Sequence, residues 1–171
     1  MKKFSKIAVL LLSLVLILDG AYRIYKGLFG DNNDKTTTSV AIGEWISDKD
    51  GVEFCVTNVD NVKSVGRDYF EISTDANFSV VTIKISNNGD EPYDVNALRF
   101  LLMIGDAEYE YATETVLSFD NYLSLDTINP GLSKEYVIVY ETPLLTDKSE
   151  CKLKIKYNAF SNENCVYIEL N

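Results

Sequence analysis

The chain contains no histidine, and this absence limits the chemistry that its side chains can perform. Histidine is the side chain most often used as a general base near neutral pH, and it is the commonest metal ligand. A Ser-His-Asp triad, a Cys-His pair and a zinc site with histidine ligands are therefore excluded within this chain. The residues that remain for chemistry are 26 aspartates and glutamates, three cysteines and 11 tyrosines.

Paired carboxylates are the main catalytic groups that this composition leaves open. Two carboxylates at a suitable separation suffice for glycoside hydrolysis. With 26 acidic residues accidental pairs are expected, and the spacing singles out none of them. A Ser-Lys dyad would be marked by the motif S-x-x-K, whereas Ser133 and Lys134 are adjacent. We therefore predict no catalytic residues and a chain that is not an enzyme, with a small hydrolase that uses paired carboxylates as the alternative.

Acidic pairs also supply oxygen ligands of the kind that calcium prefers. The two candidate pairs are Asp31 with Asp34 and Asp48 with Asp50. Neither pair fits a known calcium-loop motif, and the second pair also closes a hairpin before Gly51. Solvated surface charge is the simpler interpretation. The sequence therefore predicts neither a metal site nor a cofactor.

Aromatic residues are the candidates for a binding surface. Tyr109, Tyr111 and Tyr122 lie near presumed strand ends, and tyrosine is favoured in binding surfaces because it brings apolar area and a hydroxyl at low entropic cost. Tyrosine is also common in β-sheets, so packing within the sheet is the alternative. The single tryptophan, Trp45, is expected to seal the domain near its first strand, with ligand stacking as the alternative.

The first 30 residues differ from the rest in charge and hydropathy. They carry a net charge of +4, whereas the following 141 residues carry −14. Residues 7–18 follow three lysines and are apolar except for Ser13, a layout typical of a secretory signal. Twelve helical residues cover roughly 18 Å, short of a hydrocarbon core of about 30 Å. The apolar character resumes at Ala21, so that residues 1–30 could also span a membrane as a tilted helix.

Two outcomes remain open for this segment. No A-x-A cleavage pattern follows the apolar run, which favours an uncleaved N-terminal hydrophobic helix that anchors the chain in the membrane. Cleavage of a signal peptide followed by secretion is the alternative. The leading lysines predict that the acidic body lies outside the cytoplasm. No cysteine ends the run, which argues against lipid attachment, and the acidity of the body argues against nucleic acid as a partner.

Residues 31–41 are polar and lack periodicity, so they are predicted to be a linker to a domain over 42–171. Short β-rich runs separated by turn residues fill this domain. The runs cover residues 42–47, 51–60, 68–74, 78–87, 96–104, 107–113, 134–141, 151–157 and 163–170. The stretch 114–127 fits no single period and holds either a short helical turn or another strand.

Apolar residues alternate with polar ones in several of these runs. In 151–157, Leu153 and Ile155 share a face with Cys151, while three lysines occupy the other face. The runs 52–56 and 81–85 alternate in the same way, and all three should face one core. Residues 136–140 are apolar on both faces, which predicts a strand covered on both sides. Many short strands without an amphipathic helix predict an all-β sandwich or barrel.

Several turn and strand residues occur in a distinctive order along 80–112 and 128–143. They are Asn87 to Asp90 with Pro92, then Phe100, Gly105 with Tyr109, Pro130 with Gly131, and Tyr140 with Pro143. In this order they resemble a bacterial family of exported proteins, often lipoproteins, described as a domain of unknown function. The chain departs from that family in lacking a lipid-attachment cysteine and in an extra strand that contains Cys165. The resemblance implies an immunoglobulin-like (telokin-like) antiparallel β-sandwich outside the cytoplasm, with no established enzyme activity and no named ligand.

The three cysteines allow one disulfide in an oxidising compartment. Alternation places Cys151 toward the core and Cys55 and Cys165 on outward faces. In the immunoglobulin-like sandwich that the resemblance implies, the first and last strands can be neighbours, so Cys55 with Cys165 is the preferred pair. The alternative is that all three cysteines are reduced and Cys151 is a core residue.

These features predict an uncharacterised cell-envelope or secreted protein whose non-catalytic domain is a macromolecule-binding or interaction module. Its expected partners are the membrane, through the N-terminal segment, and a protein or cell-wall component. A structural or sensory spacer is a further alternative, because a fold alone does not fix a function.

Overall fold

The computed structural model describes residues 39–48, 51–123, 126–144, 150–157 and 165–171. The predicted anchor or signal segment over 1–30 lies outside the described residues, as does most of the predicted linker. Within the described ranges, no helix combines the length and the apolar character needed to cross a membrane.

The described chain consists of strands and short 3-10 helices. The strands are β1 (Ser39–Val40), β2 (Ile46–Ser47), β3 (Val52–Val65), β4 (Ile72–Asn87), β5 (Tyr93–Asp94), β6 (Arg99–Ile104), β7 (Ala107–Tyr109), β8 (Thr127–Ile128), β9 (Ser133–Thr142), β10 (Cys151–Lys156) and β11 (Cys165–Glu169). The 3-10 helices are η1 (Asp68–Phe70), η2 (Val95–Ala97) and η3 (Thr113–Ser118).

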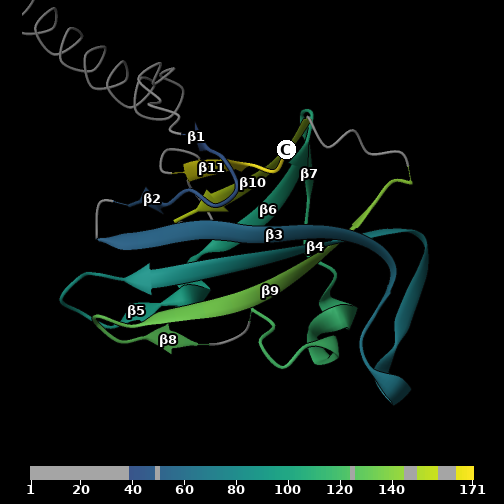
Figure 1. The fold of residues 1–171 in the computed structure, drawn as a ribbon, viewed down its shortest axis with the longest axis horizontal. Coiled ribbons are helices and arrows are strands. Elements are labelled where there is room, and N and C mark those ends of the chain that lie inside the picture. Colours follow the sequence, from purple (N-terminus) through teal and green to yellow (C-terminus); the bar gives the residue numbers. More distant parts are fainter. Residues whose placement is uncertain (1–38, 49–50, 124–125, 145–149, 158–164) are drawn as a thin grey trace, which may run out of the picture. The chain divides into compact units, whose positions relative to one another are not determined.

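Two main sheets form the fold (Figure 1). One sheet has the strand order β1-β11-β10-β6-β7 and the other has the order β2-β3-β4-β9, while β5 and β8 form a separate two-stranded ladder. Neighbouring strands are antiparallel except β1, which runs parallel to β11. Apolar side chains from both sheets meet in one core. The predicted all-β sandwich is therefore confirmed.

The period-2 alternation explains which side chains enter this core. Phe54 of β3, Ile83 of β4 and Ile155 of β10 are completely buried, together with their neighbours two residues away along each strand. Each such side chain contributes about 1.5–3 kcal/mol of transfer free energy on burial. The prediction that the three alternating runs face one core is confirmed.

Strand β9 is buried on both faces, as the apolar run 136–140 predicts. Ile138 and Tyr140 belong to the main core, whereas Val137 and Val139 face a second cluster on the other side of the sheet. We call this group the second cluster; its buried members are Val65, Phe78, Ala112, Tyr122, Val137 and Val139. The ambiguous stretch 114–127 supplies its cover with η3 and with a bridge between Tyr122 and Val137, and it ends in strand β8, whose Ile128 belongs to the main core.

Three details differ from the expectations. Strand β1 lies inside the predicted linker, so the domain begins before Ile42. The predicted strand over 68–74 is instead η1 followed by the start of β4, which continues without a break to Asn87. Trp45 does not seal the core: it is 43% exposed, with Lys84 Nζ 5.9 Å from its ring centroid, because the neighbouring Ile46 occupies the inward position.

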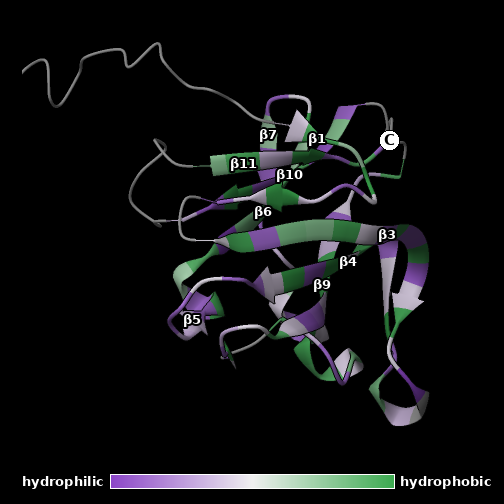
Figure 2. Cartoon of the chain, turned by 60° about the vertical axis from the view of Figure 1, so that its left-hand side comes forward, coloured by the Kyte–Doolittle hydropathy of each residue, from purple (hydrophilic) through white to green (hydrophobic). Residues whose placement is uncertain are grey.

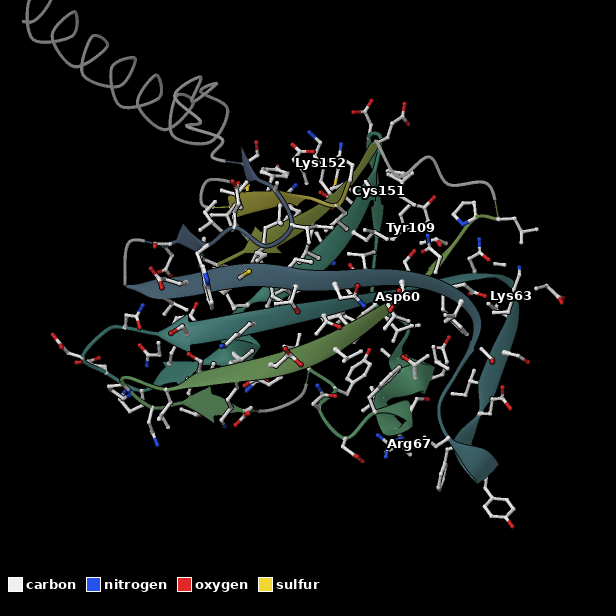
Figure 3. The ribbon with its side chains drawn as sticks, in the orientation of Figure 1. Asp60, Lys63, Arg67, Tyr109, Cys151 and Lys152 are labelled. Carbon is white, nitrogen blue, oxygen red and sulfur yellow. The ribbon has the colours of Figure 1, made fainter. Side chains whose placement is uncertain are left out.

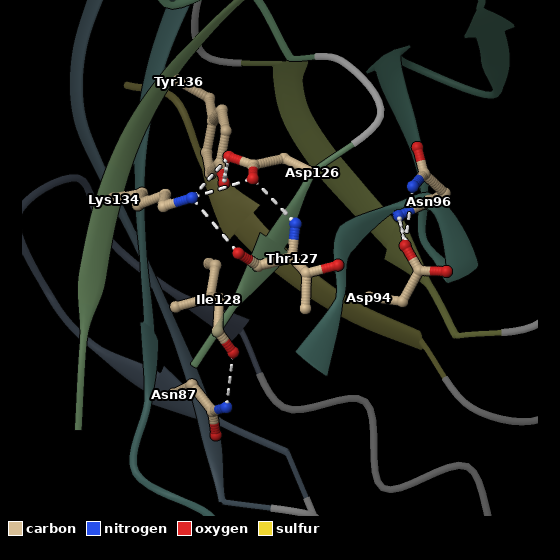
Figure 4. Close-up of polar contacts among 8 residues, drawn as sticks. All are labelled: Asn87, Asp94, Asn96, Asp126, Thr127, Ile128, Lys134 and Tyr136. Atoms are coloured by element: carbon tan, nitrogen blue, oxygen red, sulfur yellow. Dashed lines mark hydrogen bonds and ion pairs between the residues drawn. The ribbon is translucent and has the colours of Figure 1, made fainter. Parts of the chain in front are cut away.

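Asn87 links the turn after β4, strand β8 and the turn at Gly131 through its side chain and backbone, and Figure 4 shows its contact with Ile128. Its buried Nδ2 donates to the carbonyl oxygens of Glu91 and Ile128, each at 2.8 Å, and its Oδ1 accepts from Gly89 N at 3.0 Å. Its backbone N–H and C=O bond to Leu132 and Gly131. The turn sequence that begins at Asn87 therefore has a structural role.

Replacement of Asn87 by alanine should destabilise the domain. The substitution leaves the buried carbonyl group of Ile128, the partly buried carbonyl group of Glu91 and the N–H of Gly89 without these partners, which costs about 2–4 kcal/mol. Asn58→Ala, at an exposed position on β3, is the matched control and should change the free energy of unfolding by less than about 0.5 kcal/mol. Denaturant unfolding monitored by circular dichroism measures both values; equal effects would contradict the structural role.

Replacement of Tyr140 by phenylalanine should not destabilise the domain. Tyr140 is fully buried, and its hydroxyl has no hydrogen-bond partner among the described residues. Removal of a buried unpaired hydroxyl should be neutral or should stabilise by about 1 kcal/mol. The control is Tyr136→Phe, which removes a 2.8 Å hydrogen bond to Asp126 and should cost about 1–2 kcal/mol. Thermal unfolding distinguishes the two; a large loss for Tyr140→Phe would contradict this assignment.

Candidate functional site

The β3–β4 hairpin continues as an arm beyond the body of its sheet (Figure 1). Strand β4 pairs with β9 only from residue 77 onward, whereas it pairs with β3 from residue 72. Register shifts between Val56 and Asn58 and between Val62 and Ser64 interrupt the ladder of β3. Such bulges bend a strand, and the arm curves accordingly.

The turn at the end of the arm exposes two adjacent aromatic side chains. Gly66 has a φ of +108°, and a Cβ atom there would lie 2.2 Å from the carbonyl oxygen of Phe70, so only glycine fits. The chain then forms η1, which leaves Tyr69 100% exposed and Phe70 63% exposed. Part of this turn is coloured green, as hydrophobic, in Figure 2. The local backbone therefore holds both rings in solvent.

The 3-10 helix η3 lies beside this turn. Arg67 Nη1 is 3.2 Å from Asp120 Oδ2, and Arg67 is labelled at the base of the turn in Figure 3. Val65 of the arm is a buried member of the second cluster, and the half-buried Val116 of η3 packs against the same cluster. Leu117 on the same helix is 78% exposed.

We call Tyr69, Phe70 and Leu117 together the apolar tip. Full burial of a large apolar side chain stabilises a protein by about 1.5–3 kcal/mol, and these exposed side chains do not contribute that free energy to folding. The ion pair between Arg67 and Asp120 is exposed and of little energetic weight, so the packing of the second cluster supports the tip. This arrangement suits contact with a partner and provides no catalytic group.

An open pocket beside η3 contains several polar side chains. It is lined by Asp120, Asn121, Tyr122, Asp126, Lys134, Glu135 and Tyr136. Asp126 is the centre of its polar contacts (Figure 4). Lys134 Nζ lies 2.8 and 2.9 Å from the two carboxylate oxygens of Asp126, and Tyr136 Oη donates to Oδ2 at 2.8 Å. Thr127 N donates to Oδ1 at 2.8 Å.

These contacts hold Asp126 as an anion. The hydrogen bonds from Lys134 and Tyr136 lower the pKa of the Asp126 carboxyl below its usual value. Burial, together with the hydrogen bond to Asp126, raises the pKa of the Tyr136 hydroxyl. A general acid needs a raised carboxyl pKa. The group therefore suits a fixed ion pair that holds β8 against β9.

A second open pocket lies at the turn after β4. Asn87, Gly89, Asp90, Glu91, Pro92 and Tyr93 line it. The polar atoms of the Asn87 side chain are already used in the contacts that tie this turn to β8. Two exposed acidic side chains at a turn do not by themselves form a site.

A third polar group lies on the outer face of the five-stranded sheet. Lys154 Nζ is 2.6 Å from Glu108 Oε1, and Lys156 Nζ is 3.7 Å from Glu108 Oε2. Both lysines are buried, although the alternation of β10 predicts a solvent face for them. The hydrogen bond from Lys154 lowers the pKa of Glu108, so this carboxylate too is a fixed anion. Among the described residues, no three potential ligands come together as a metal site.

The three tyrosines predicted as a possible binding surface differ in exposure. Tyr122 is only 5% exposed, and its hydroxyl donates to the carbonyl oxygen of Ala112 at 3.3 Å. Tyr109 is half-buried against the main core, and Tyr111 alone is exposed, with its ring edge-on to Tyr122 at 6.5 Å. The burial of Tyr122 in the second cluster fits the alternative of packing against the sheet, whereas a binding role for Tyr109 and Tyr111 stays a prediction.

Cys55 lies in the four-stranded sheet, whereas Cys151 and Cys165 lie on neighbouring strands of the five-stranded sheet. Cys55 on β3 is buried, and its Sγ contacts the carbonyl oxygen of Val56 at 3.7 Å. Cys165 on β11 is half-buried, with its Sγ 3.5 Å from the Tyr167 hydroxyl. Cys151 on β10 is buried at the edge of the main core, as predicted. A disulfide between Cys55 and Cys165 stays a prediction.

The predicted acidic pairs fall partly outside the described residues. Asp31, Asp34 and Asp50 lie there. Asp48 Oδ1 accepts from Val52 N at 2.8 Å, which is the hairpin role expected of this residue.

Known proteins share the fold at low sequence identity. An uncharacterised β-sandwich protein from Clostridium difficile 630 is 16% identical, with a TM-score of 0.55, covering 82% of this chain and 99% of its own. The yjhA protein of Bacillus subtilis is 17% identical, with a TM-score of 0.59 and coverage of 77% and 99%. MPT63, a secreted protein of Mycobacterium tuberculosis, is 13% identical, with a TM-score of 0.58 and coverage of 79% and 98%.

No curated protein sequence matches the chain. One family does match, over residues 33–165, which is most of the sequence. The chain therefore belongs to the DUF4352 family, which is defined as a domain of unknown function.

Proposed function

We propose that the chain is an extracytoplasmic, non-catalytic interaction module that contacts another protein through the apolar tip. The observation that carries the proposal is the exposure of Tyr69, Phe70 and Leu117 at one end of the sandwich. Large aromatic side chains are enriched in protein interfaces, and tyrosine is among the usual energetic centres. The second cluster holds the chain on either side of these side chains, at Val65, Ile72 and Val116, which lowers the entropic cost of ordering the backbone on binding.

An extracytoplasmic location is supported by the sequence and by a structural relative. The basic start and the apolar run over residues 7–18 are typical of an export signal or an anchor. MPT63, which is similar in fold, is a secreted protein. In this proposal the N-terminal segment either anchors the chain in the membrane or is cleaved, so that the domain is released.

The strand order supports an immunoglobulin-like form of the sandwich. Strands β3 and β4 lie in one sheet, β6 and β7 in the other, β9 returns to the first, and β10 and β11 complete the second. This alternation between sheets is typical of immunoglobulin-like domains, which present binding residues in the turns at the ends of the sandwich. The apolar tip occupies such a turn.

The electrostatics of the carboxylates support a non-catalytic role. Asp126 and Glu108 have lowered pKa values because cationic partners contact them, which is the direction opposite to that of a carboxylic acid poised to donate a proton. This argues against Asp126 and Glu108 as the general acid of a hydrolase.

The double substitution Tyr69→Ser and Phe70→Ser should remove the partner without unfolding the domain. Both side chains are exposed, so the melting temperature should change little, whereas the loss of two interface side chains should weaken binding about tenfold or more. Chemical cross-linking on intact cells, followed by mass spectrometry, measures which proteins remain attached.

The matched control is Leu132→Ser with Leu144→Ser, two exposed leucines outside the tip. The control should keep the cross-linked proteins of the wild type. If the tip variant retains every cross-link, or if the control loses the same ones, the tip is not the contact surface.

A further inference from the structure

The exposed charges around the apolar tip are mainly acidic. Four exposed carboxylates lie on the arm and around η3: Glu71, Asp75, Glu114 and Asp120. Two cations share this end of the molecule, Lys63 and Arg67. The rim of the tip therefore has an excess of negative charge.

Local contacts already engage both cations. Arg67 pairs with Asp120, and Lys63 Nζ donates to the backbone carbonyl oxygens of Asp75 and Ala76 (Figure 3). The carboxylates of Glu71 and Glu114 have no ion-pair partner among the described residues. The Asp75 carboxylate is likewise without an ion-pair partner there, so three carboxylates remain to meet charges on a partner. Glu71 directly follows Phe70 and Glu114 lies on η3 with Leu117, so these two adjoin the apolar tip along the chain.

The charge of the whole body acts in the same direction. Residues 31–171 carry a net charge of −14, so the long-range field attracts cations and repels anions. Surfaces rich in anionic lipid are disfavoured for this reason. A second copy of the chain is disfavoured as well, because a symmetric contact would place two acidic rims against each other.

Resting on the proposed function, we infer that the partner is a protein whose contact surface is an apolar pocket with a rim of lysine or arginine residues. Burial of Tyr69, Phe70 and Leu117 in the pocket supplies the affinity. Glu71 and Glu114 meet the basic rim and accelerate the encounter, an effect that salt screens.

The test uses the full-length chain in the cells that produce it, with the photo-reactive residue p-benzoylphenylalanine in place of Leu117. A copy with the same residue in place of Leu132, away from the tip, is the reference. The cross-linked band at position 117 is then compared between the parent chain and the variant Glu71→Lys with Glu114→Lys. The variant Glu91→Lys with Asp106→Lys reverses two exposed charges elsewhere and is the matched control.

The inference predicts a band at position 117 but not at 132. The band should weaken several-fold in Glu71→Lys with Glu114→Lys, should persist in the control, and should weaken when the cells are labelled at about 0.5 M instead of about 0.1 M salt. An unchanged band in the charge-reversal variant overturns the basic rim and leaves the proposed function standing. The absence of any band specific to position 117 overturns the proposed function itself.

Flotation with defined vesicles completes the test. Vesicles of phosphatidylcholine and vesicles that also contain phosphatidylglycerol are mixed with the purified full-length chain. Binding that is lost in Tyr69→Ser with Phe70→Ser would identify a membrane as the partner of the tip and would overturn the inference. The expected result is flotation that this double substitution does not change.

Discussion

Strand β9 is buried on both faces, and this double burial determines the structure of the end of the sandwich that carries the apolar tip. A strand with Val137 and Val139 on the face away from the main core needs an apolar cover there. The segment 112–122 supplies this cover with Ala112 and Tyr122, and the arm of the β3–β4 hairpin closes the cluster from the side with Val65. One buried strand thus brings η3 and the turn of the arm to the same end of the sandwich.

The turn that begins at Asn87 acts in the same structural way. The Asn87 amide and backbone bind the turn after β4, strand β8 and the turn at Gly131 to one another. The lysine and tyrosine around Asp126 fix the other side of β8. Because these polar groups are used in holding the fold, they do not point to a ligand. Exposed turns such as the one at Tyr69 are free of such structural duties, and exposed turns are where binding residues are commonly found.

Much of the fold could be predicted from the sequence, because alternation over four or more residues fixes which side of a strand is buried. The body of β3, the body of β4 and strand β10 follow from this rule, whereas the double burial of β9 follows from a run that is apolar on both faces. The continuation of β3 and β4 into the arm, to Val65 and from Ile72, was not predicted. The two-residue strands β5 and β8 could not be predicted, since they are too short to show a period and depend on contacts such as that of Asn87 with Ile128.

The candidate site was harder to predict, because exposure is a tertiary property. Tyr122 and Tyr69 have the same side chain in similar local settings, and only the cover over β9 makes one buried and the other exposed. A local signal did exist for the tip: two aromatic residues follow Gly66 in a hairpin turn, where neither has a strand neighbour to pack against. The buried lysines of β10 were missed for the same reason, since Glu108 comes from another strand.

We propose that the apolar tip is solvent-exposed in the isolated protein and covered by a partner in the cell. Hydroxyl-radical footprinting with mass spectrometry, on the purified full-length chain and on intact cells, distinguishes these two states. We expect rapid oxidation of Tyr69 and Phe70 in the purified protein and strong protection of both in cells, while the exposed Trp45 is oxidised equally in the two samples. Equal oxidation of Tyr69 and Phe70 in both samples would contradict it.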